Sequence, residues 1–230
     1  MNYRAVTAAE PPAVGPGAVG PGAVGPASGT RLRLITALAE AIGDKGYAGT
    51  TIADVVAAAR VSKRTFYEHF ADKEECLLAL YAYACEQLME VLRASGAVDG
   101  LSWRERVRRS AYSYLAAIEE APAITRAVLV EMQAAGPRAF ALRRRTQERF
   151  AEVLRELVEQ ARVGEPEVRP LSPALALAIV GGINELLLHA VDPYAGGEPA
   201  GDPAHPITGL TEAVTELVSA VLAYRAPASG

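Results

Sequence analysis

The stretch from Thr50 to Glu74 decides the fold, and it reads TTIADVVAAARVSKRTFYEHFADKE. Thr51, Ser62 and Asp72 are each placed to cap the start of a helix, and Thr51 and Asp72 are followed three residues later by a carboxylate that completes a capping box. Starts this close together leave room for a short helix, a turn of about three residues, a second short helix and then a long one. The spacing therefore predicts a helix-turn-helix that continues into a long helix ending at about residue 94.

The second short helix has one apolar and one polar face. Phe66 and Phe70 lie four residues apart and give it the apolar face. The other face carries hydrogen-bond donors, namely Lys63, Arg64, Thr65, Tyr67 and His69. From Arg60 to Lys73 there are four basic residues and two acidic ones, in a chain whose net charge is −4. Local positive charge on a helix-turn-helix is what attraction to phosphates requires.

The chain after Gly29 shows the apolar spacing of helices, and no window has sustained period-two alternation. A first helix is expected over 30–45, where an apolar stripe ends at Gly46. Caps and prolines mark later starts, and the expected helices span about 102–120, a segment from 122, 136–163, 173–191 and 207–224. We therefore expect an all-α chain of about nine helices.

The two ends of the chain differ from this pattern. Residues 13–29 repeat Ala, Val, Gly and Pro, so a disordered arm is expected over 1–29, and residues 226–230 are expected to form a flexible tail. Two matches to the dinucleotide pattern G-x-G-x-x-G begin at Gly15 and Gly20. Both are discarded, because no strand precedes them and no helix follows.

Composition bounds the class of protein. The chain has 230 residues, enough to bury a core without disulfides or metals, and its acidic balance argues against a surface that coats nucleic acid or membrane. Cys76 and Cys85 are expected on opposite faces of one helix, roughly 13 Å apart along its axis, so they cannot bridge each other. A cytoplasmic location is the default without disulfides or a secretory signal. The apolar run from Ala174 to Ala190 contains Glu185 and is interpreted as a buried helix rather than a membrane span.

A family resemblance rests on Thr51, on the turn that ends at Val61-Ser62, and on the pattern Thr65-Phe66-Tyr67-x-His69-Phe70-x-x-Lys73-Glu74. At these residues the chain resembles the tetracycline-repressor (TetR) family of bacterial transcriptional regulators, over about residues 31–80. The resemblance implies a three-helix DNA-binding domain at 30–76 and a helical ligand-binding and dimerisation domain at 77–225. Many members have Gly where this chain has Arg60, so either the turn relaxes or Arg60 reaches a phosphate.

The polar face can be divided by chemistry and by resemblance. Lys63, Arg64 and Thr65 are expected nearest the base edges of a major groove, since they suit guanine acceptors and the thymine methyl. By resemblance, phosphates would be held by Thr51, Tyr67, His69 and Lys73. The alternative for each is an ordinary solvated side chain, or a half-buried one for Tyr67. No metal site or cofactor is expected, because the other histidines are remote from His69 and no carboxylate or Cys has ligand spacing.

The C-terminal half offers weaker signals. By resemblance, helices 173–191 and 207–224 pair with the same helices of a second subunit in a four-helix bundle, and the alternative is that they complete the core of one chain. Six residues suit an apolar ligand cavity and ordinary core equally well: Cys85, Met89, Trp103, Tyr112, Met132 and Phe140. The arginines from Arg138 to Arg149 are interpreted as a solvated helix face, with an anionic ligand entrance as the alternative.

These patterns predict a homodimeric repressor that a small-molecule effector releases from a palindromic operator, and not an enzyme. One alternative is a helical enzyme that uses the central cavity, although no nucleophile-base pair or phosphate loop is visible. Another is a dimeric scaffold for partner helices. A scaffold would show no salt-dependent affinity for duplex DNA.

Overall fold

The structure is a computed structural model that describes residues 26–191 and 205–224. Within these residues the chain forms helices and turns and no strand, which confirms the all-α fold. The helices are α1 (Pro26–Gly49), α2 (Ile52–Ala58), α3 (Lys63–His69), α4 (Lys73–Gly96), α5 (Trp103–Glu119), α6 (Pro122–Arg126), η1 (Ala127–Glu131), α7 (Met132–Ala134), α8 (Gly136–Gly164), α9 (Pro173–Val191), η2 (Thr208–Leu210) and α10 (Thr211–Ala223). Most of the predicted arm, 1–25, and the tail at 226–230 lie outside the described residues.

The three closely spaced helix starts form as predicted. The Thr51 hydroxyl accepts a hydrogen bond from the Asp54 amide, and the Asp54 carboxylate accepts one from the Thr51 amide, which completes a capping box. Ser62 caps α3, and Asp72 caps α4. The capping box predicted at Asp72 is incomplete, because the Glu75 carboxylate accepts from the Ala71 amide at 2.7 Å instead of from the amide of Asp72.

The first helix is longer than predicted. It begins at Pro26 and is traced to Gly49, whereas the sequence indicated 30–45. The predicted end nevertheless marks a real change of geometry, because Gly46 has a φ of 70° and a ψ of 166° and kinks the helix there. The stop signal was therefore correct in its position, and a further turn follows the kink.

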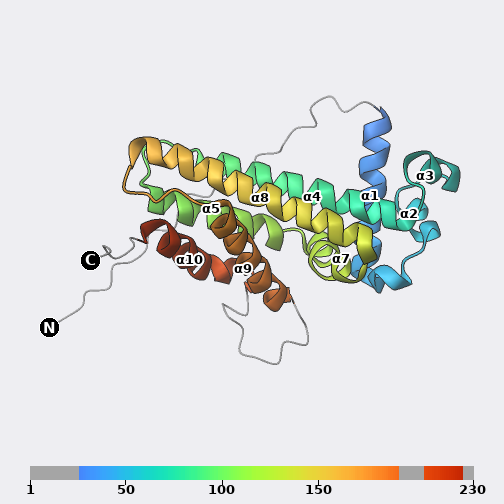
Figure 1. Cartoon of the computed structure of the whole chain (residues 1–230). Helices are drawn as coiled ribbons and strands as arrows, with labels where there is room; N and C mark the ends of the chain where they lie inside the picture. The colour runs from blue at the N-terminus through green and yellow to red at the C-terminus, as the bar shows by residue number, and fades with distance from the viewer. Residues whose placement is uncertain (1–25, 192–204, 225–230) are drawn as a thin grey trace.

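A continuous core joins the helix-turn-helix to the rest of the chain. Phe66 and Phe70 are almost fully buried, and they belong to one hydrophobic cluster with Leu38 of α1, Leu77 of α4 and Phe150 of α8. Cys76 and Cys85 are both buried and free. Figure 1 shows α4 running from the helix-turn-helix end of the molecule alongside α8 into the C-terminal half. The helix-turn-helix is therefore packed firmly against α1 and α4 through this core.

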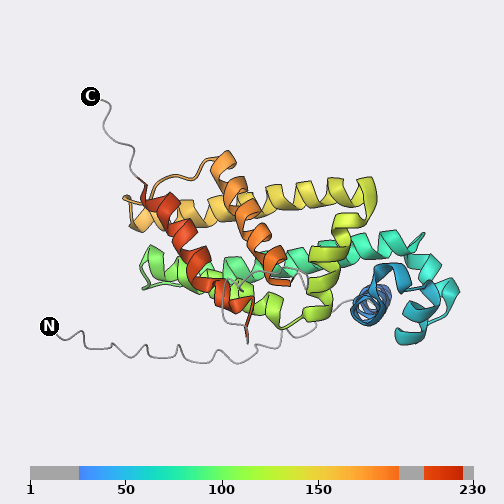
Figure 2. The ribbon, with the colours of Figure 1, turned by 90° about the horizontal axis from the view of Figure 1, so that it is seen from below.

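The C-terminal half is a layered bundle. α4 packs on α5 and α8, and α9 and α10 cross the far side of α8 and α5, as Figure 2 shows. α6, η1 and α7 follow one another directly from Pro122 to Ala134, and the middle piece has π-helical geometry. Counted as one segment, and with η2 leading into α10, they bring the described residues to nine helical segments, the number predicted.

Truncating Phe66 tests the role of the core beneath α3. Phe66→Ala should reduce the free energy of unfolding by about 3–5 kcal/mol, because it opens a cavity under α3. Tyr67→Ala is the control, because Tyr67 is 57% exposed and its loss should cost less than about 1 kcal/mol. Chemical denaturation of both variants measures the difference, and equal losses would contradict this assignment of the two faces.

Candidate functional site

The polar face of α3 lies on the outside of the molecule. Lys63, Arg64 and Tyr67 are exposed, and Thr65 and His69 are half-buried. The Arg64 guanidinium makes an ion pair with Glu68 one turn along, at 3.3 Å, with the Arg64 side chain 90% exposed. α3 lies at the end of the molecule opposite α10 (Figure 1). The structure therefore brings these five residues together on one surface that no other described element covers.

Thr51 lies beside this face and is fixed in place. Its hydroxyl donates to the Asp54 carboxylate at 2.7 Å, and Lys45 makes an ion pair with the same carboxylate at 2.6 Å. The hydrogen bond from Lys45, followed by those from Thr51, holds the pKa of Asp54 well below its usual range. Asp54 therefore stays ionised at neutral pH and keeps Thr51 oriented at the start of α2.

Lys73 takes a position that its expected phosphate role did not indicate. Its ammonium donates to the backbone carbonyls of Tyr47 and Thr50, each at 2.6 Å, and lies 4.1 Å from the centre of the Tyr47 ring. Burial lowers the pKa of Lys73. The structure thus shows Lys73 tying the start of α4 to the link between α1 and α2, and its contact with a phosphate remains a prediction.

Arg60 is the one non-glycine residue with a positive φ among the described residues, at 54°. Its side chain is exposed, and none of the ion pairs in the described part of the chain includes it. A relaxed turn at this position is therefore wrong, because the backbone keeps the left-handed conformation that Gly adopts most easily. The other expectation, that Arg60 reaches a phosphate, stays a prediction.

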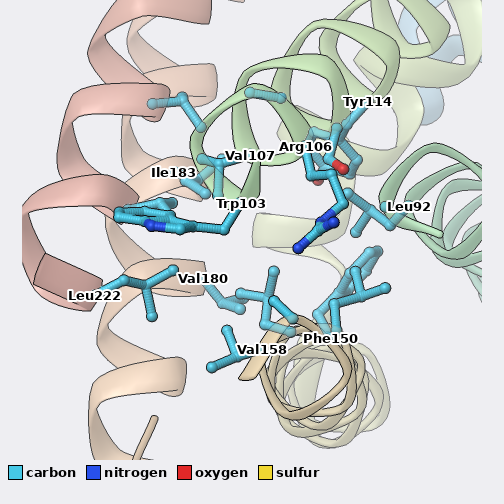
Figure 3. Close-up of a pocket in the computed structure, with 18 of the residues that line it drawn as sticks. Leu92, Trp103, Arg106, Val107, Tyr114, Phe150, Val158, Val180, Ile183 and Leu222 are labelled. Atoms are coloured by element: carbon cyan, nitrogen blue, oxygen red, sulfur yellow. The ribbon is translucent and has the colours of Figure 1, made fainter. Parts of the chain in front are cut away.

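Two cavities lie inside the C-terminal half. The first has a volume of about 110 Å³ and is lined mainly by apolar residues of α4, α5, α8, α9 and α10. Figure 3 shows Trp103 on its wall and the Arg106 guanidinium directed into it. The second has a volume of about 170 Å³ and lies between α4, α5, the α6–α7 segment, α8 and α9. Tyr114, Phe150 and Val180 belong to both walls, so the cavities adjoin.

Only some of the residues predicted to line a cavity do so. Trp103 lines the first cavity and Cys85 the second. Met89 and Met132 are buried in the core and line neither. These two are ordinary packing residues, the alternative that the sequence left open.

Tyr112 and Phe140 were wrong as cavity residues, because they are 52% and 66% exposed. Each follows a buried alanine, Ala111 or Ala139, that points into the bundle. One residue further along a helix turns the side chain by about 100° and out of the core. Sequence reasoning also missed several lining residues that are polar or common: Arg106, Tyr114, Gln133, Gln147 and Asn184.

Comparison with known proteins agrees with this geometry. Residues 34–80 match the family model described as "Bacterial regulatory proteins, tetR family". The chain is 45% identical to the HTH-type transcriptional regulator CymR of Pseudomonas putida over 65 residues, 28% of this chain and 32% of that protein. The matches span only 20% and 32% of the length of two curated relatives.

Solved structures resemble a larger part of the fold. The fatty acid degradation regulator FadR from Bacillus halodurans superposes with a TM-score of 0.70 at 17% identity, over 89% of this chain and 100% of that one. The FadR of Bacillus subtilis in complex with stearoyl-CoA gives a TM-score of 0.66 at 16% identity, over 84% and 99%. At these identities the likeness shows the shared fold.

The fold and the exposed polar face of α3 are those of a helix-turn-helix protein. Residues 34–80 are therefore identified as an N-terminal domain of the kind found in the tetR family of bacterial regulatory proteins. The resemblance stated from the sequence is confirmed. The family and the curated relatives are transcriptional regulators and not enzymes, as predicted for this chain.

Substitutions of Arg60 can separate the effect of backbone strain on stability from the effect of the Arg60 charge on DNA binding. Arg60→Gly should raise the free energy of unfolding by about 0.5–1 kcal/mol, because Gly adopts the positive φ without a steric penalty. The same change should lower the slope of log affinity for duplex DNA against log salt by about 0.9, if Arg60 neutralises one phosphate. Arg60→Lys should keep the slope and gain no stability. An unchanged slope in Arg60→Gly would rule out the phosphate contact.

Proposed function

We propose that this chain is a cytoplasmic, homodimeric repressor that binds a palindromic DNA operator through α3 and is released by a small-molecule effector. The observation that carries the proposal is the exposed face of α3, where two cations, two aromatic donors and a hydroxyl are supported from below by buried Phe66 and Phe70. Such a face on a short helix suits the major groove, which admits an α-helix and presents base edges.

The side chains of this face divide between bases and phosphates. Lys63 and Arg64 stand near the N-terminus of α3 and suit the guanine O6 and N7 acceptors. The Thr65 hydroxyl is 2.9 Å from the Ser62 hydroxyl, so its methyl group is the part available to a thymine methyl. Tyr67, His69 and Thr51 lie to the sides, where phosphates flank the groove. The Arg64–Glu68 ion pair is exposed and weak, so DNA can displace it at little cost.

The surface of α9 supports a second subunit. α9 is long and apolar enough to cross a membrane by length and composition, with a mean hydropathy of 1.8, yet only 17% of it is buried within one chain. This low burial argues against the alternative that α9 and α10 only complete the core of one chain. Its exposed residues recur at helical spacing, at Ala174, Leu177, Ala178 and Gly181. A second copy would cover this face, and α10 of each subunit would complete a four-helix bundle.

The route from effector to DNA would run along α4. α4 begins at the Lys73 link to the helix-turn-helix, and further along it lines both cavities, with Cys85 and Leu92 among its contributions. A ligand that favours a different position of α4 would move both recognition helices out of operator spacing. The likeness to a FadR structure in complex with stearoyl-CoA supports a small-molecule ligand in a fold of this kind.

Loss of the α3 side chains tests DNA binding. The double variant Arg64→Ala, Tyr67→Ala should lower affinity for an operator selected from random DNA at least about tenfold, because a bidentate base contact alone is worth about 1–3 kcal/mol. Electrophoretic mobility shift at several salt concentrations is the measurement. Arg144→Ala is the matched control, because Arg144 also faces a glutamate one turn along, on α8. Unchanged binding by the double variant, with its circular dichroism intact, would reject the proposal and favour a dimeric scaffold.

A charge on α9 tests the dimer. Leu177→Arg should convert the dimer to monomer in sedimentation experiments, because it would bury an unpaired cation between the subunits. Glu152→Arg, on an exposed position of α8, is the control and should leave the mass unchanged. A monomeric parent protein, or a Leu177→Arg variant that stays dimeric, would contradict an interface on this face.

A further inference from the structure

We infer that the second cavity binds the carboxylate of a small organic acid and that the apolar tail of this acid extends into the first cavity. The inference rests on the proposed function, because it names the chemical class of the effector. Its basis is the charge and polarity of the two adjoining cavities.

The second cavity contains one charged side chain, Arg143, and no carboxylate among its lining residues. Arg143 donates to the amide oxygen of Gln133, and none of the ion pairs within the described residues includes it. The other cavity-directed guanidinium differs, because Arg106 pairs with Glu165 at 3.2 Å and donates to the Leu101 carbonyl at 2.7 Å. Arg143 therefore keeps donors for an anion, whereas the charge of Arg106 is already balanced.

The neighbouring arginines of α8 differ from Arg143, because several of them pair with a glutamate. Arg138 pairs with Glu74 at 3.2 Å, Arg144 lies 3.9 Å from Glu148, and Arg149 pairs with Glu86 at 2.7 Å. Arg145 is exposed and makes no ion pair within the described residues, and together these arginines form the solvated face that the sequence indicated. Arg143 separates from them because it lies on the wall of the second cavity. The alternative of an anionic ligand entrance thus applies to this one residue.

The rest of the second cavity suits a carboxylate. Its polar lining includes neutral groups that can donate hydrogen bonds, namely Tyr81, Tyr83, Gln87, Gln133, Gln147 and Asn184. The Thr125 hydroxyl is not one of them, because it already donates to the Ile118 carbonyl at 2.7 Å. A carboxylate is an acceptor only, and a guanidinium with neighbouring amide donors matches both of its oxygens. A ligand cation would meet Arg143 with no carboxylate in the lining to balance it. The site therefore selects an acid over an amine.

The side chains shared by the two cavities are aromatic or aliphatic, and we expect the tail of the acid to pass between them. Tyr114 and Phe150 stand edge to face, with ring centres 6.1 Å apart, and form a shared wall with Val180. Beyond them the first cavity is lined by Trp103, Leu154 and Val158, among other apolar residues, as Figure 3 partly shows. A dry cavity of about 150 Å³ can hold a benzene molecule. By the same ratio the first cavity, of about 110 Å³, takes about four carbons and the second, of about 170 Å³, about seven, so an acid of about eight to twelve carbons would fill both.

Calorimetry with the full-length protein, without DNA, tests the site. The probes are decanoate, decanol as the uncharged match, and decanoyl coenzyme A as the thioester source of the same chain. We expect decanoate to bind at least tenfold more tightly than decanol, and affinity to rise about threefold to fourfold with each added methylene from hexanoate to decanoate. Equal binding of decanol, or binding of the thioester without binding of the acid, would overturn the inference.

Paired arginine variants locate the contact. Arg143→Gln should weaken decanoate binding at least tenfold and leave decanol unaffected, whereas Arg144→Gln should change neither by more than about twofold. Arg143→Lys keeps the charge and should retain most of the preference for the acid, which guards against a folding defect in the Gln variant. An Arg143→Gln variant that still prefers decanoate would overturn the assignment of Arg143.

The passage between the cavities has its own test. Val180→Phe should narrow it, so that hexanoate binds as before while decanoate loses its gain from the longer chain. Equal effects on both acids would place the tail elsewhere and overturn this part of the inference.

Mobility shift with and without decanoate separates this inference from the proposed function. Decanoate that binds the protein but does not release DNA would leave the cavity assignment standing and reject the effector role. A protein that binds its operator but takes up no acid would keep the DNA-binding function and reject the acid site.

Discussion

The burial of Phe66 and Phe70 is the interaction on which the functional surface depends. α3 has only seven residues and would not hold its shape alone in water, because short helices gain most of their stability from packing. The two rings lie 5.6 Å apart between their centres and join a core shared with α1 and α4. Because this side of α3 is anchored in the core, the opposite side faces solvent. The packing of Phe66 and Phe70 therefore fixes the orientation of the polar residues of α3.

The same core has consequences for the boundary between the domains. The sequence suggested a division between residues 76 and 77, yet Cys76 and Leu77 belong to a single hydrophobic cluster that extends to Phe150 of α8. Lys73 reinforces this continuity by tying the start of α4 to two carbonyls of the α1–α2 link. A displacement of α4 can therefore be passed to the helix-turn-helix through packed contacts. Allosteric coupling needs a packed element with two arrangements, and this is the role that we propose for α4.

Local features of the fold were predictable from the sequence, and long-range features were not. Thr51, Ser62 and Asp72 act through atoms within a few residues of themselves, so their caps could be predicted from spacing alone. The cavities depend on which side of each helix faces inward, and Tyr112 and Phe140 show that one residue of phase error is enough to miss them. The hydrogen-bond acceptors of Lys73 could not be predicted either, because every residue has a backbone carbonyl and the sequence does not indicate which one is used.

Charge distribution explains how an acidic chain can serve an anionic partner. Half of the described arginines of the C-terminal half pair with a glutamate, as Arg108 pairs with Glu212 at 2.8 Å, and the charges of these pairs cancel at a distance. Among the described residues, the cations of α3 have no carboxylate partner apart from the exposed Arg64–Glu68 contact. Arg60 adds another cation that has no carboxylate partner in the described part of the chain. Because screening removes the influence of charges beyond about 8–10 Å, DNA meets the local charge of α3 rather than the net charge of the chain. Arg143 is the one charged side chain in the lining of the second cavity, where its partial burial reduces screening by solvent.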